Sequence, residues 1–284
     1  MERKPIDAIV VYCSPAGSTR RVAQVIETVL SERGIPCTAA DLGADKGREA
    51  ASRAAQGMTE STCLFIGSPV YASHPVPPVT EFIRNLPGGS RAMAVPFVTW
   101  GAASSGLALH DMGAALSGKG LRLIGAAKVV ALHSMMWRVP NPMGEGRPNE
   151  ADDRKVRQLM EVVIDRMTAG GAAETLSLAD LDYQPAAFRE EMAAAGLEKA
   201  KAHMPRRLVH EERCTRCGVC VEVCPTGAVE MTPFPTFSDR CIFCFNCVRE
   251  CPEEAIGVDL SKTESMIRAR SARFDEHPGT QIFL

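Results

Sequence analysis

The chain has 284 residues and a formal net charge of −2, and 45% of its residues are hydrophobic and 23% are charged. This length favours two domains. The near-neutral charge gives no basic excess of the kind that binds nucleic acid, so we expect no nucleic-acid partner. No apolar run approaches the roughly 18 residues of a membrane-spanning helix. No apolar signal-peptide core follows residues 1–6, so we expect neither a signal peptide nor a membrane span.

The first 170 residues alternate between strand-like and helix-like patterns. Residues 6–12 form a continuous, mostly β-branched run that is typical of a strand buried on both faces. The same reading gives further strands at 35–41, 62–67, 91–100 and 121–132, and helices at 17–30, 45–56, 78–86, 107–117 and 150–168. Five strands that alternate with helices predict an α/β fold with a parallel sheet covered on both faces.

A polar loop joins the first predicted strand to the first helix. Its residues are, in order, Ser14, Pro15, Ala16, Gly17, Ser18 and Thr19. Gly17 lets backbone approach a ligand closely, and the amides of a helix N-terminus together with hydroxyl groups favour a phosphate. The loop matches neither GxGxxG nor a Walker loop. A phosphate site is one interpretation, and a helix cap without a ligand is the other.

Two further segments follow the third and fourth strands, at the edge where open α/β sheets bind ligands. Their residues are Ser68, Pro69, Val70 and Tyr71, and Thr99, Trp100, Gly101 and Ala102. We expect both segments to lie beside the phosphate loop, where Tyr71 or Trp100 could stack on a flat ligand. Packing of both aromatic side chains within the protein is the alternative. Residues 133–138 follow the fifth strand and either cover the ligand or pack in the core.

The rest of the chain divides into three predicted segments after an α/β domain at 1–170. Residues 171–207 are a helical linker with a helix over 185–202, which serves as a packed spacer or, alternatively, as a homodimer surface. Residues 208–260 form a small cysteine-rich domain. Residues 261–284 are a tail with an apolar end, and it either clamps the two domains together or meets a partner.

The cysteine-rich segment contains two matching runs of the form C-x2-C-x2-C-x3-C-P. The cysteines are Cys214, Cys217, Cys220 and Cys224 in the first run and Cys241, Cys244, Cys247 and Cys251 in the second. This spacing is typical of proteins that bind two [4Fe–4S] clusters. A pair of zinc sites or a disulfide framework is the alternative, but zinc sites usually use separated Cys pairs. Iron–sulfur cysteines fit a reducing cytoplasm, where we expect this protein.

The two halves together resemble a known family. Residues 208–260 are similar to bacterial 2[4Fe–4S] ferredoxins, and the loop at 14–20 resembles the phosphate loop of flavodoxins, although Ala16 replaces a hydroxyl residue. Residues 1–260 thus resemble the flavodoxin–ferredoxin fusion proteins of anaerobic bacteria and archaea. The resemblance implies the strand order 2-1-3-4-5 and FMN bound by the three loops. It also implies an α+β ferredoxin domain whose clusters are held by Cys214, Cys217, Cys220 and Cys251, and by Cys241, Cys244, Cys247 and Cys224.

These cofactors predict electron transfer between one-electron clusters and a flavin that holds one or two electrons. We expect a ferredoxin-linked oxidoreductase that acts on a small molecule at FMN, with a ferredoxin or reductase as redox partner. The alternatives are a carrier without a substrate, an NAD(P)H-dependent reductase and a redox sensor. A roomy flavin site lined by Tyr71, His74, Trp137 and Arg138 would favour the enzyme. The cysteine-rich segment holds four arginines against nine acidic residues, a charge that either steers a basic partner or aids solubility.

Overall fold

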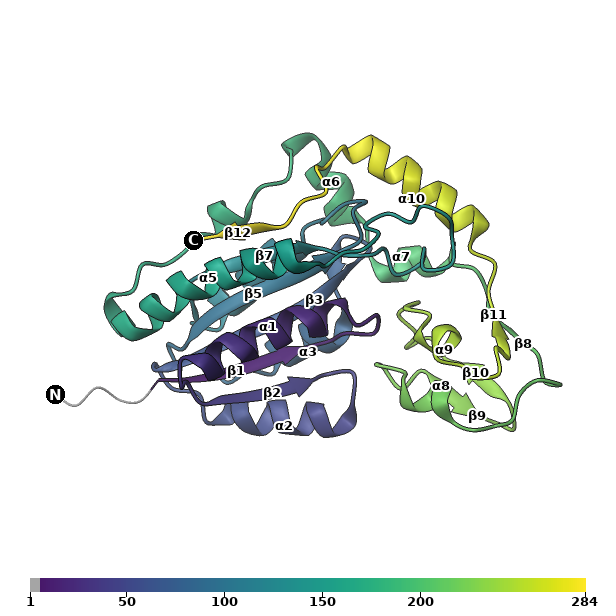
Figure 1. Cartoon of the computed structure of the whole chain (residues 1–284), viewed down its shortest axis with the longest axis horizontal. Helices are drawn as coiled ribbons and strands as arrows, with labels where there is room; N and C mark the ends of the chain where they lie inside the picture. Colours follow the sequence, from purple (N-terminus) through teal and green to yellow (C-terminus); the bar gives the residue numbers. More distant parts are fainter. Residues whose placement is uncertain (1–5) are drawn as a thin grey trace.

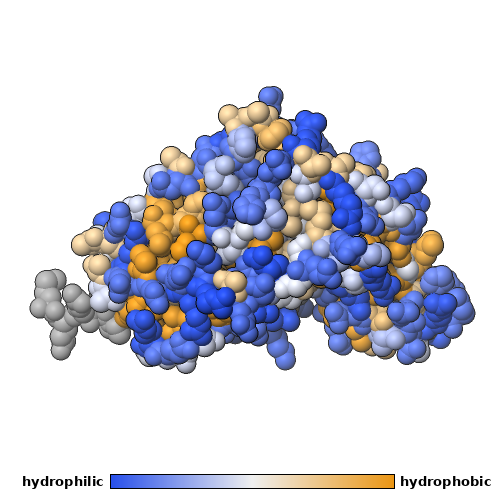
Figure 2. All heavy atoms as spheres, turned by 45° about the horizontal axis from the view of Figure 1, so that its top comes forward, coloured by the Kyte–Doolittle hydropathy of each residue, from blue (hydrophilic) through white to orange (hydrophobic). Residues whose placement is uncertain are grey.

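A computed structural model describes residues 6–284 of the chain. The residues before Ile6, where the sequence predicts no signal peptide, lie outside the described part. Within residues 6–284, no helix combines the length and the apolar character needed to cross a membrane. The surface seen in Figure 2 is mainly hydrophilic, with a hydrophobic area on the left of the view.

A parallel sheet of five long strands forms the centre of the larger domain (Figure 1). The strands are β1 (Asp7–Tyr12), β2 (Cys37–Asp41), β3 (Thr62–Tyr71), β5 (Met93–Trp100) and β7 (Ala126–Val130). Their order across the sheet is β2-β1-β3-β5-β7. This arrangement confirms the predicted α/β class and the predicted order 2-1-3-4-5.

Helices cover both faces of this sheet. They are α1 (Ser18–Glu32), α2 (Asp45–Gln56), α3 (Pro77–Arg84), α4 (Ala108–Gly118) and α5 (Glu150–Ala169). Alternate residues of β1 point to opposite faces, so Val10 packs in the core beneath α1 and α5, while Val11 packs in the core beneath α2, α3 and α4. Burial on both faces explains why residues 8–12 of β1 are all hydrophobic.

Three predicted elements differ from the structure. The fifth predicted strand is interrupted, because β6 (Arg122–Leu123) pairs with β5 before β7 begins. The predicted third strand continues to Tyr71 and turns back as β4 (His74–Pro75). The predicted helix over 185–202 is two helices, α6 (Ala186–Ala194) and α7 (Leu197–Lys201), which are separated by Gly196 with φ 157°. Only glycine adopts that backbone readily.

The cysteine-rich segment folds into short elements at one end of the sheet (Figure 1). They are β8 (Leu208–Val209), α8 (Val219–Glu222), β9 (Val229–Met231), β10 (Pro235–Phe237), α9 (Asn246–Arg249) and β11 (Ile256–Gly257). Strands β9 and β10 form one antiparallel pair, and β8 and β11 form another. This is the predicted small α+β domain.

The C-terminal residues return from this segment to the α/β domain. Helix α10 (Ser261–Phe274) crosses the molecule, and strand β12 (Gln281–Phe283) then pairs antiparallel with β7 at the edge of the sheet (Figure 1). Two 3-10 turns, Gly170–Ala172 and Leu178–Leu181, lie between α5 and α6. Because β12 pairs with β7, it covers backbone groups that would otherwise be exposed at a sheet edge.

Candidate functional site

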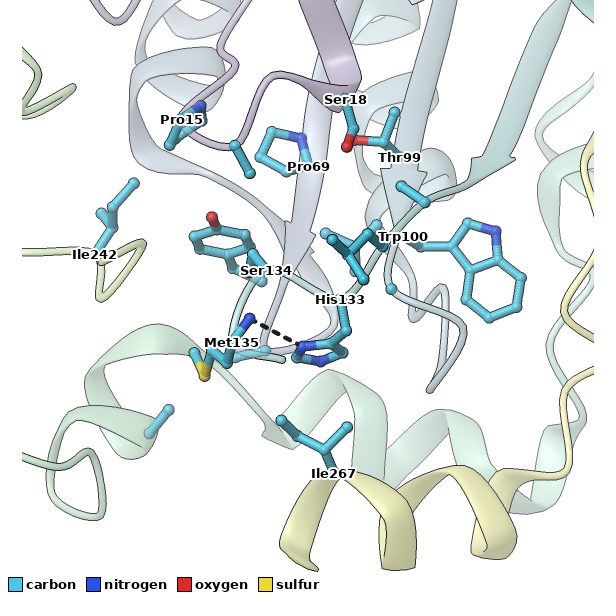
Figure 3. Close-up of a pocket in the computed structure, with 18 of the residues that line it drawn as sticks. Pro15, Ser18, Pro69, Thr99, Trp100, His133, Ser134, Met135, Ile242 and Ile267 are labelled. Carbon is cyan, nitrogen blue, oxygen red and sulfur yellow. Dashed lines mark hydrogen bonds between the residues drawn. The ribbon is translucent and has the colours of Figure 1, made fainter. Parts of the chain in front are cut away.

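A cavity of about 330 Å³ lies at the carboxyl ends of β1, β3, β5 and β7 (Figure 3). All three predicted ligand loops contribute to its wall. The predicted residues that line it are Pro15, Ala16, Ser18, Thr19, Pro69, Val70, Tyr71, Thr99, Trp100 and Gly101. Parallel strands end at a common edge, which is why loops distant in the sequence meet here.

The predicted phosphate loop offers a ligand mainly backbone amides, because two of its three hydroxyl groups are hydrogen-bonded within the protein. Gly17, with φ 85°, precedes the first helical residue of α1, so the amides of Ser18 and Thr19 have no partner within that helix. The Thr19 and Thr99 hydroxyls bond each other at 2.8 Å, and the Ser14 hydroxyl accepts the Arg20 amide at 2.9 Å. The amides and Ser18 therefore remain for a ligand.

Four predicted ligand residues lie outside the lining of this main cavity: Ser14, Gly17, Ser68 and Ala102. Ser68 is fully buried and its hydroxyl accepts the Val76 amide at 3.0 Å, so it holds the turn toward α3. Ala102 packs in the same small core cluster as Trp100 and Val130. The backbone turns at Ala102, which has φ 58°.

The two predicted aromatic residues both line the cavity but differ in exposure, with Tyr71 at 9% and Trp100 at 1%. Trp100 is 1% exposed and packs against Ala102 and Val130, and Figure 3 shows its indole turned away from Ser134 and Pro69. The Tyr71 hydroxyl is buried without a hydrogen-bond partner among residues 6–284. Burial raises the pKa of Tyr71 far above its ordinary value, so the hydroxyl stays protonated and can donate to a bound group.

A second cavity, of about 300 Å³, opens at the N-terminus of α1 and shares Ala16, Ser18, Leu132 and Ser134 with the first. Gly17 and three arginines, Arg21, Arg147 and Arg249, also line it. Arg21 pairs with Asp153 and Arg147 with Asp152. Arg249 makes no ion pair in the described part of the chain. A helix N-terminus beside a guanidinium without a carboxylate partner favours an anion such as a phosphate.

Arg249 belongs to the cysteine-rich domain and reaches the α/β domain. Its guanidinium donates to the carbonyls of Ser134 at 2.8 Å and Pro15 at 3.3 Å, and it lies 5.0 Å from the centre of the Trp137 ring. No sequence pattern predicts that this residue reaches the site. Its position two residues after Cys247 was the only available signal, and it says nothing about a contact 234 residues away.

His133 lies in the wall of the main cavity and is half-buried there (Figure 3). Burial lowers the pKa of His133 to about 4, so the ring is neutral near pH 7. Its Nδ1 accepts the Met135 amide at 3.3 Å, which assigns the ring hydrogen to Nε2. The imidazole is therefore a neutral hydrogen-bond donor at this site.

Two helices outside the α/β framework cover the main cavity. Leu197 and Ala200 of α7 lie on one side, and Thr263, Met266, Ile267 and Arg270 of α10 lie on another. Ile267 faces His133 from α10 in Figure 3. The tail predicted to clamp or to bind a partner therefore covers the cavity, and its apolar residues supply that cover.

The other residues predicted to make a roomy site lie elsewhere. The Nδ1 of His74 is 2.6 Å from Asp111, and its Nε2 is 3.1 Å from the Met192 carbonyl oxygen. Arg138 is exposed and pairs with Glu254, and Trp137 lines only the second cavity. Tyr71 alone of this predicted group lines the main cavity.

The eight cysteines of the two runs cluster in two places. Cys214, Cys217, Cys220 and Cys251 line one small cavity. In the second place Cys247 feels the charges of Cys241 and Cys224, and Cys244 those of Cys247 and Cys241; Cys247 also packs in the same cluster as Cys220 of the first place. The first group contains the four cysteines of one ligand set that the ferredoxin resemblance implies, and both sets stay predictions. Within residues 6–284 no cysteine forms a disulfide, and no three His, Cys, Asp or Glu side chains are placed to hold a single metal ion.

The second cysteine group adjoins the main cavity. Ile242 lines that cavity, and Ile242 and Cys244 pack in the same apolar core as Cys13 and Tyr71. Arg48 also bridges the two domains, because its guanidinium donates to the carbonyls of Leu42 at 2.8 Å and Pro225 at 3.3 Å. Pro225 directly follows Cys224.

Comparison with known proteins identifies the cysteine-rich domain. Residues 207–252 match the 4Fe-4S dicluster domain family. No curated protein matches the chain in sequence.

Solved structures resemble the α/β domain. An archaeal flavodoxin is 16% identical with a TM-score of 0.43, over 57% of this chain and 99% of its own. Megasphaera elsdenii flavodoxin is 20% identical with a TM-score of 0.39, over 56% of this chain and 98% of its own. Rubredoxin oxygen:oxidoreductase from Desulfovibrio gigas is 18% identical with a TM-score of 0.42, over 60% of this chain but only 38% of its own.

Proposed function

We propose that this chain, a fusion of a flavodoxin-like α/β domain with a 4Fe-4S dicluster domain, is an iron–sulfur flavoprotein that passes electrons between two [4Fe–4S] clusters and FMN. One observation supports the proposal above the others. The second cysteine group packs against the wall of the cavity that the three ligand loops form, through Ile242 and Cys244. A redox centre held there would adjoin a ligand in the cavity.

The residues of the two cavities fit FMN. The amides of Ser18 and Thr19, with Arg249, would hold the phosphate in the second cavity. The Tyr71 hydroxyl, which has no partner among the described residues, would donate to the FMN ring system, or the Tyr71 ring would lie against the edge of that system. The neutral His133 would hold a proton at Nε2 beside the FMN rings. When bound, FMN supplies two-electron chemistry and each cluster supplies one-electron chemistry.

The two four-cysteine groups supply the thiolates that such clusters need. We propose Cys214, Cys217, Cys220 and Cys251 for one cluster and Cys224, Cys241, Cys244 and Cys247 for the other. Burial raises the pKa of Cys244 to about 12 and that of Cys247 to about 11. These buried sulfurs therefore become thiolates when iron binds them, and cluster binding releases protons.

The small volume of the main cavity and its cover by α10 favour an electron carrier over an enzyme with its own substrate. Its volume of about 330 Å³ is near the lower end of the roughly 300–1,000 Å³ typical of ligand pockets, and α10 covers it. FMN would leave little room for a second molecule. We propose a ferredoxin or a reductase as redox partner, in a reducing cytoplasm, with the domain division at 170, 207 and 260. A homodimer through 171–207 is part of the same proposal.

A second candidate is the reduction of a small anionic acceptor at the flavin. Arg270 favours it, because this guanidinium lines the main cavity and makes no ion pair within residues 6–284. It donates only to the Ser73 hydroxyl, at 2.8 Å, and burial lowers its pKa. Quenching of the bound flavin's fluorescence by simple carboxylates, lost in Arg270→Met, would support this candidate over the carrier.

The first test is anaerobic reconstitution with iron, sulfide and FMN, followed by reductive titration with reduced ferredoxin, NADH and NADPH in separate experiments. We expect both kinds of centre to bind and only reduced ferredoxin to reduce them rapidly. Rapid reduction by a nicotinamide would make the protein a nicotinamide-dependent reductase. Absence of FMN from the reconstituted protein would refute the flavin assignment.

The phosphate position is tested by Gly17→Glu. The new carboxylate would repel a phosphate at the N-terminus of α1, so we expect loss of FMN with unchanged iron content. Gly17→Ala controls for strain at φ 85°, and Gly88→Glu adds the same charge in an exposed loop with no atom within 4 Å of the new Cβ. Both controls should retain FMN, whereas full FMN content in Gly17→Glu would contradict the phosphate position.

A further inference from the structure

Arg207 contacts one of the cysteine sulfurs directly. It lies between α7 and β8, outside both cysteine runs, and its Nη1 donates to Cys241 Sγ at 2.9 Å. The guanidinium lies 4.0 Å from the ring centre of Phe237 and 5.2 Å from that of Phe243. No carboxylate pairs with Arg207 in the part of the chain that the structure describes. The aromatic rings therefore hold a positive charge against a sulfur that the proposed function assigns to a cluster.

This contact has no counterpart in the other cysteine group. The last cysteine of each run accepts an equivalent hydrogen bond from the backbone amide four residues later. Cys224 accepts the Ala228 amide at 3.1 Å, and Cys251 accepts the Ala255 amide at 3.3 Å. Cys241, the first cysteine of the second run, accepts from two donors, Arg207 and the Phe243 amide at 3.3 Å. Within residues 6–284, no arginine donates to Cys214, which occupies the equivalent place in the first run.

Burial alone would make the second group the harder one to reduce. Reduction adds a negative charge, and burial disfavours charge. Cys241, Cys244 and Cys247 are buried, whereas Cys217 is exposed. A hydrogen bond from a permanently charged guanidinium acts in the opposite direction, because it stabilises the more negative, reduced form.

We propose that Arg207 raises the reduction potential of the cluster held by Cys224, Cys241, Cys244 and Cys247, and so directs electrons to the cysteine group beside the flavin cavity. The step is the transfer of one electron between the two clusters. No bond breaks and no proton moves. The electron comes from the one-electron iron–sulfur donor that the proposed function names. This inference rests on the proposed function for the presence of the two clusters and for their electron donor.

The test is Arg207→Gln in the full-length protein reconstituted with both clusters and FMN. The two cluster potentials are measured by EPR during a mediated redox titration. We expect one potential to fall by about 59 mV, which corresponds to a tenfold change in a one-electron equilibrium, while the other stays constant. Arg207→Lys keeps the charge but loses the planar fork and the aromatic stacking, so its shift should be smaller.

Two further variants distinguish the outcomes. Arg216→Gln removes a charge beside the first group, where Arg216 is exposed and stacks on Phe234 at 5.6 Å, and it should leave the second potential unchanged. Phe237→Leu loosens the guanidinium without changing charge, and it should shift the same potential as Arg207→Gln, by less.

Iron and sulfide contents separate failure of the inference from failure of the proposed function. If the wild type binds no clusters, the proposed function is wrong. If Arg207→Gln keeps full iron content with both potentials unchanged, or with both shifted equally, the role of Arg207 is refuted. If Arg207→Gln loses a cluster, the potentials are measured in Arg207→Lys and Phe237→Leu instead. The role of Arg207 is then refuted if both variants keep full iron content with both potentials unchanged or both shifted equally.

Discussion

The neutral state of His133 follows from its burial in the cavity wall, and it makes folding stability depend on pH. The pKa of His133 is about 4 in the folded protein, below the ordinary value of about 6.5 that applies when the chain is unfolded. Between these two values the unfolded chain binds more protons. Stability therefore rises with pH across this window and is lost as the pH falls through it.

His133→Gln should remove that part of the pH dependence. Between pH 5.5 and 7.5 the wild type should gain about 1 kcal/mol more folding free energy than the variant. Anaerobic urea unfolding at the two pH values measures the difference. His277→Gln, in the exposed tail, is the control and should behave as the wild type. Equal pH dependence of wild type and His133→Gln would show that this histidine is not neutral in the folded protein.

At the residue scale, sequence predicts the ligand loops better than the side chains that complete the site. Ser18, Pro69 and Thr99 were predicted because strand ends in a parallel sheet meet at one edge, which is a local rule. The orientation of Trp100 depends on Val130 in another strand. Arg207 contacts a residue 34 positions away, and no spacing rule anticipates such a contact.

Among the elements, α10 is fixed over the cavity by a buried ion pair just beyond its end. Glu276 lies 2.5 Å from Lys128 of β7, and the two side chains are 11% and 6% exposed. Glu276 also accepts the Ser105 amide at 2.8 Å and the Gln184 amide group at 3.1 Å. Burial acts to raise the pKa of Glu276, but Lys128 and the hydrogen bonds from Ser105 outweigh it and lower the pKa.

Glu276→Gln should free the C-terminal segment. The variant leaves the Lys128 ammonium buried without its carboxylate, a loss of about 3–5 kcal/mol in typical buried pairs. We expect a lower unfolding midpoint in urea and faster FMN dissociation. Glu264→Gln removes an exposed pair with Arg268 on α10 itself and should change stability by about 0.5 kcal/mol or less. Equal FMN dissociation rates in both variants would show that Glu276 does not hold the cover.

At the element scale, sequence predicts strand order only through resemblance. The α/β alternation follows from local sequence patterns, and the Ala-rich, charged composition of residues 45–56 predicts α2 at its observed bounds, Asp45–Gln56. Strand β12 has three residues and pairs with β7, which is about 150 positions earlier in the chain. Such a short apolar segment has no periodicity of its own, so only the packed structure assigns it to the sheet.

For the whole molecule, the acidic cysteine-rich domain predicts how a partner binds. Its four arginines and nine acidic residues should attract a basic redox protein. We expect the bimolecular rate of electron transfer to a basic c-type cytochrome to fall steeply between about 20 and 300 mM salt, because salt shortens the range of charge attraction. Stopped-flow absorbance measures the rate. An acidic ferredoxin should show the opposite trend, and a rate independent of salt would mean that this surface does not steer partners.

The return of the chain through α10 to β12 also determines how freely the two domains can move. A fusion joined by one linker leaves the second domain on a flexible tether, and its redox centre must diffuse into position before each transfer. Here the cysteine-rich domain is attached at both ends, through residues 202–207 on one side and α10 on the other, and both attachments lead back to the same sheet. Internal electron transfer should therefore proceed at a fixed distance, and its rate should not respond to solvent viscosity.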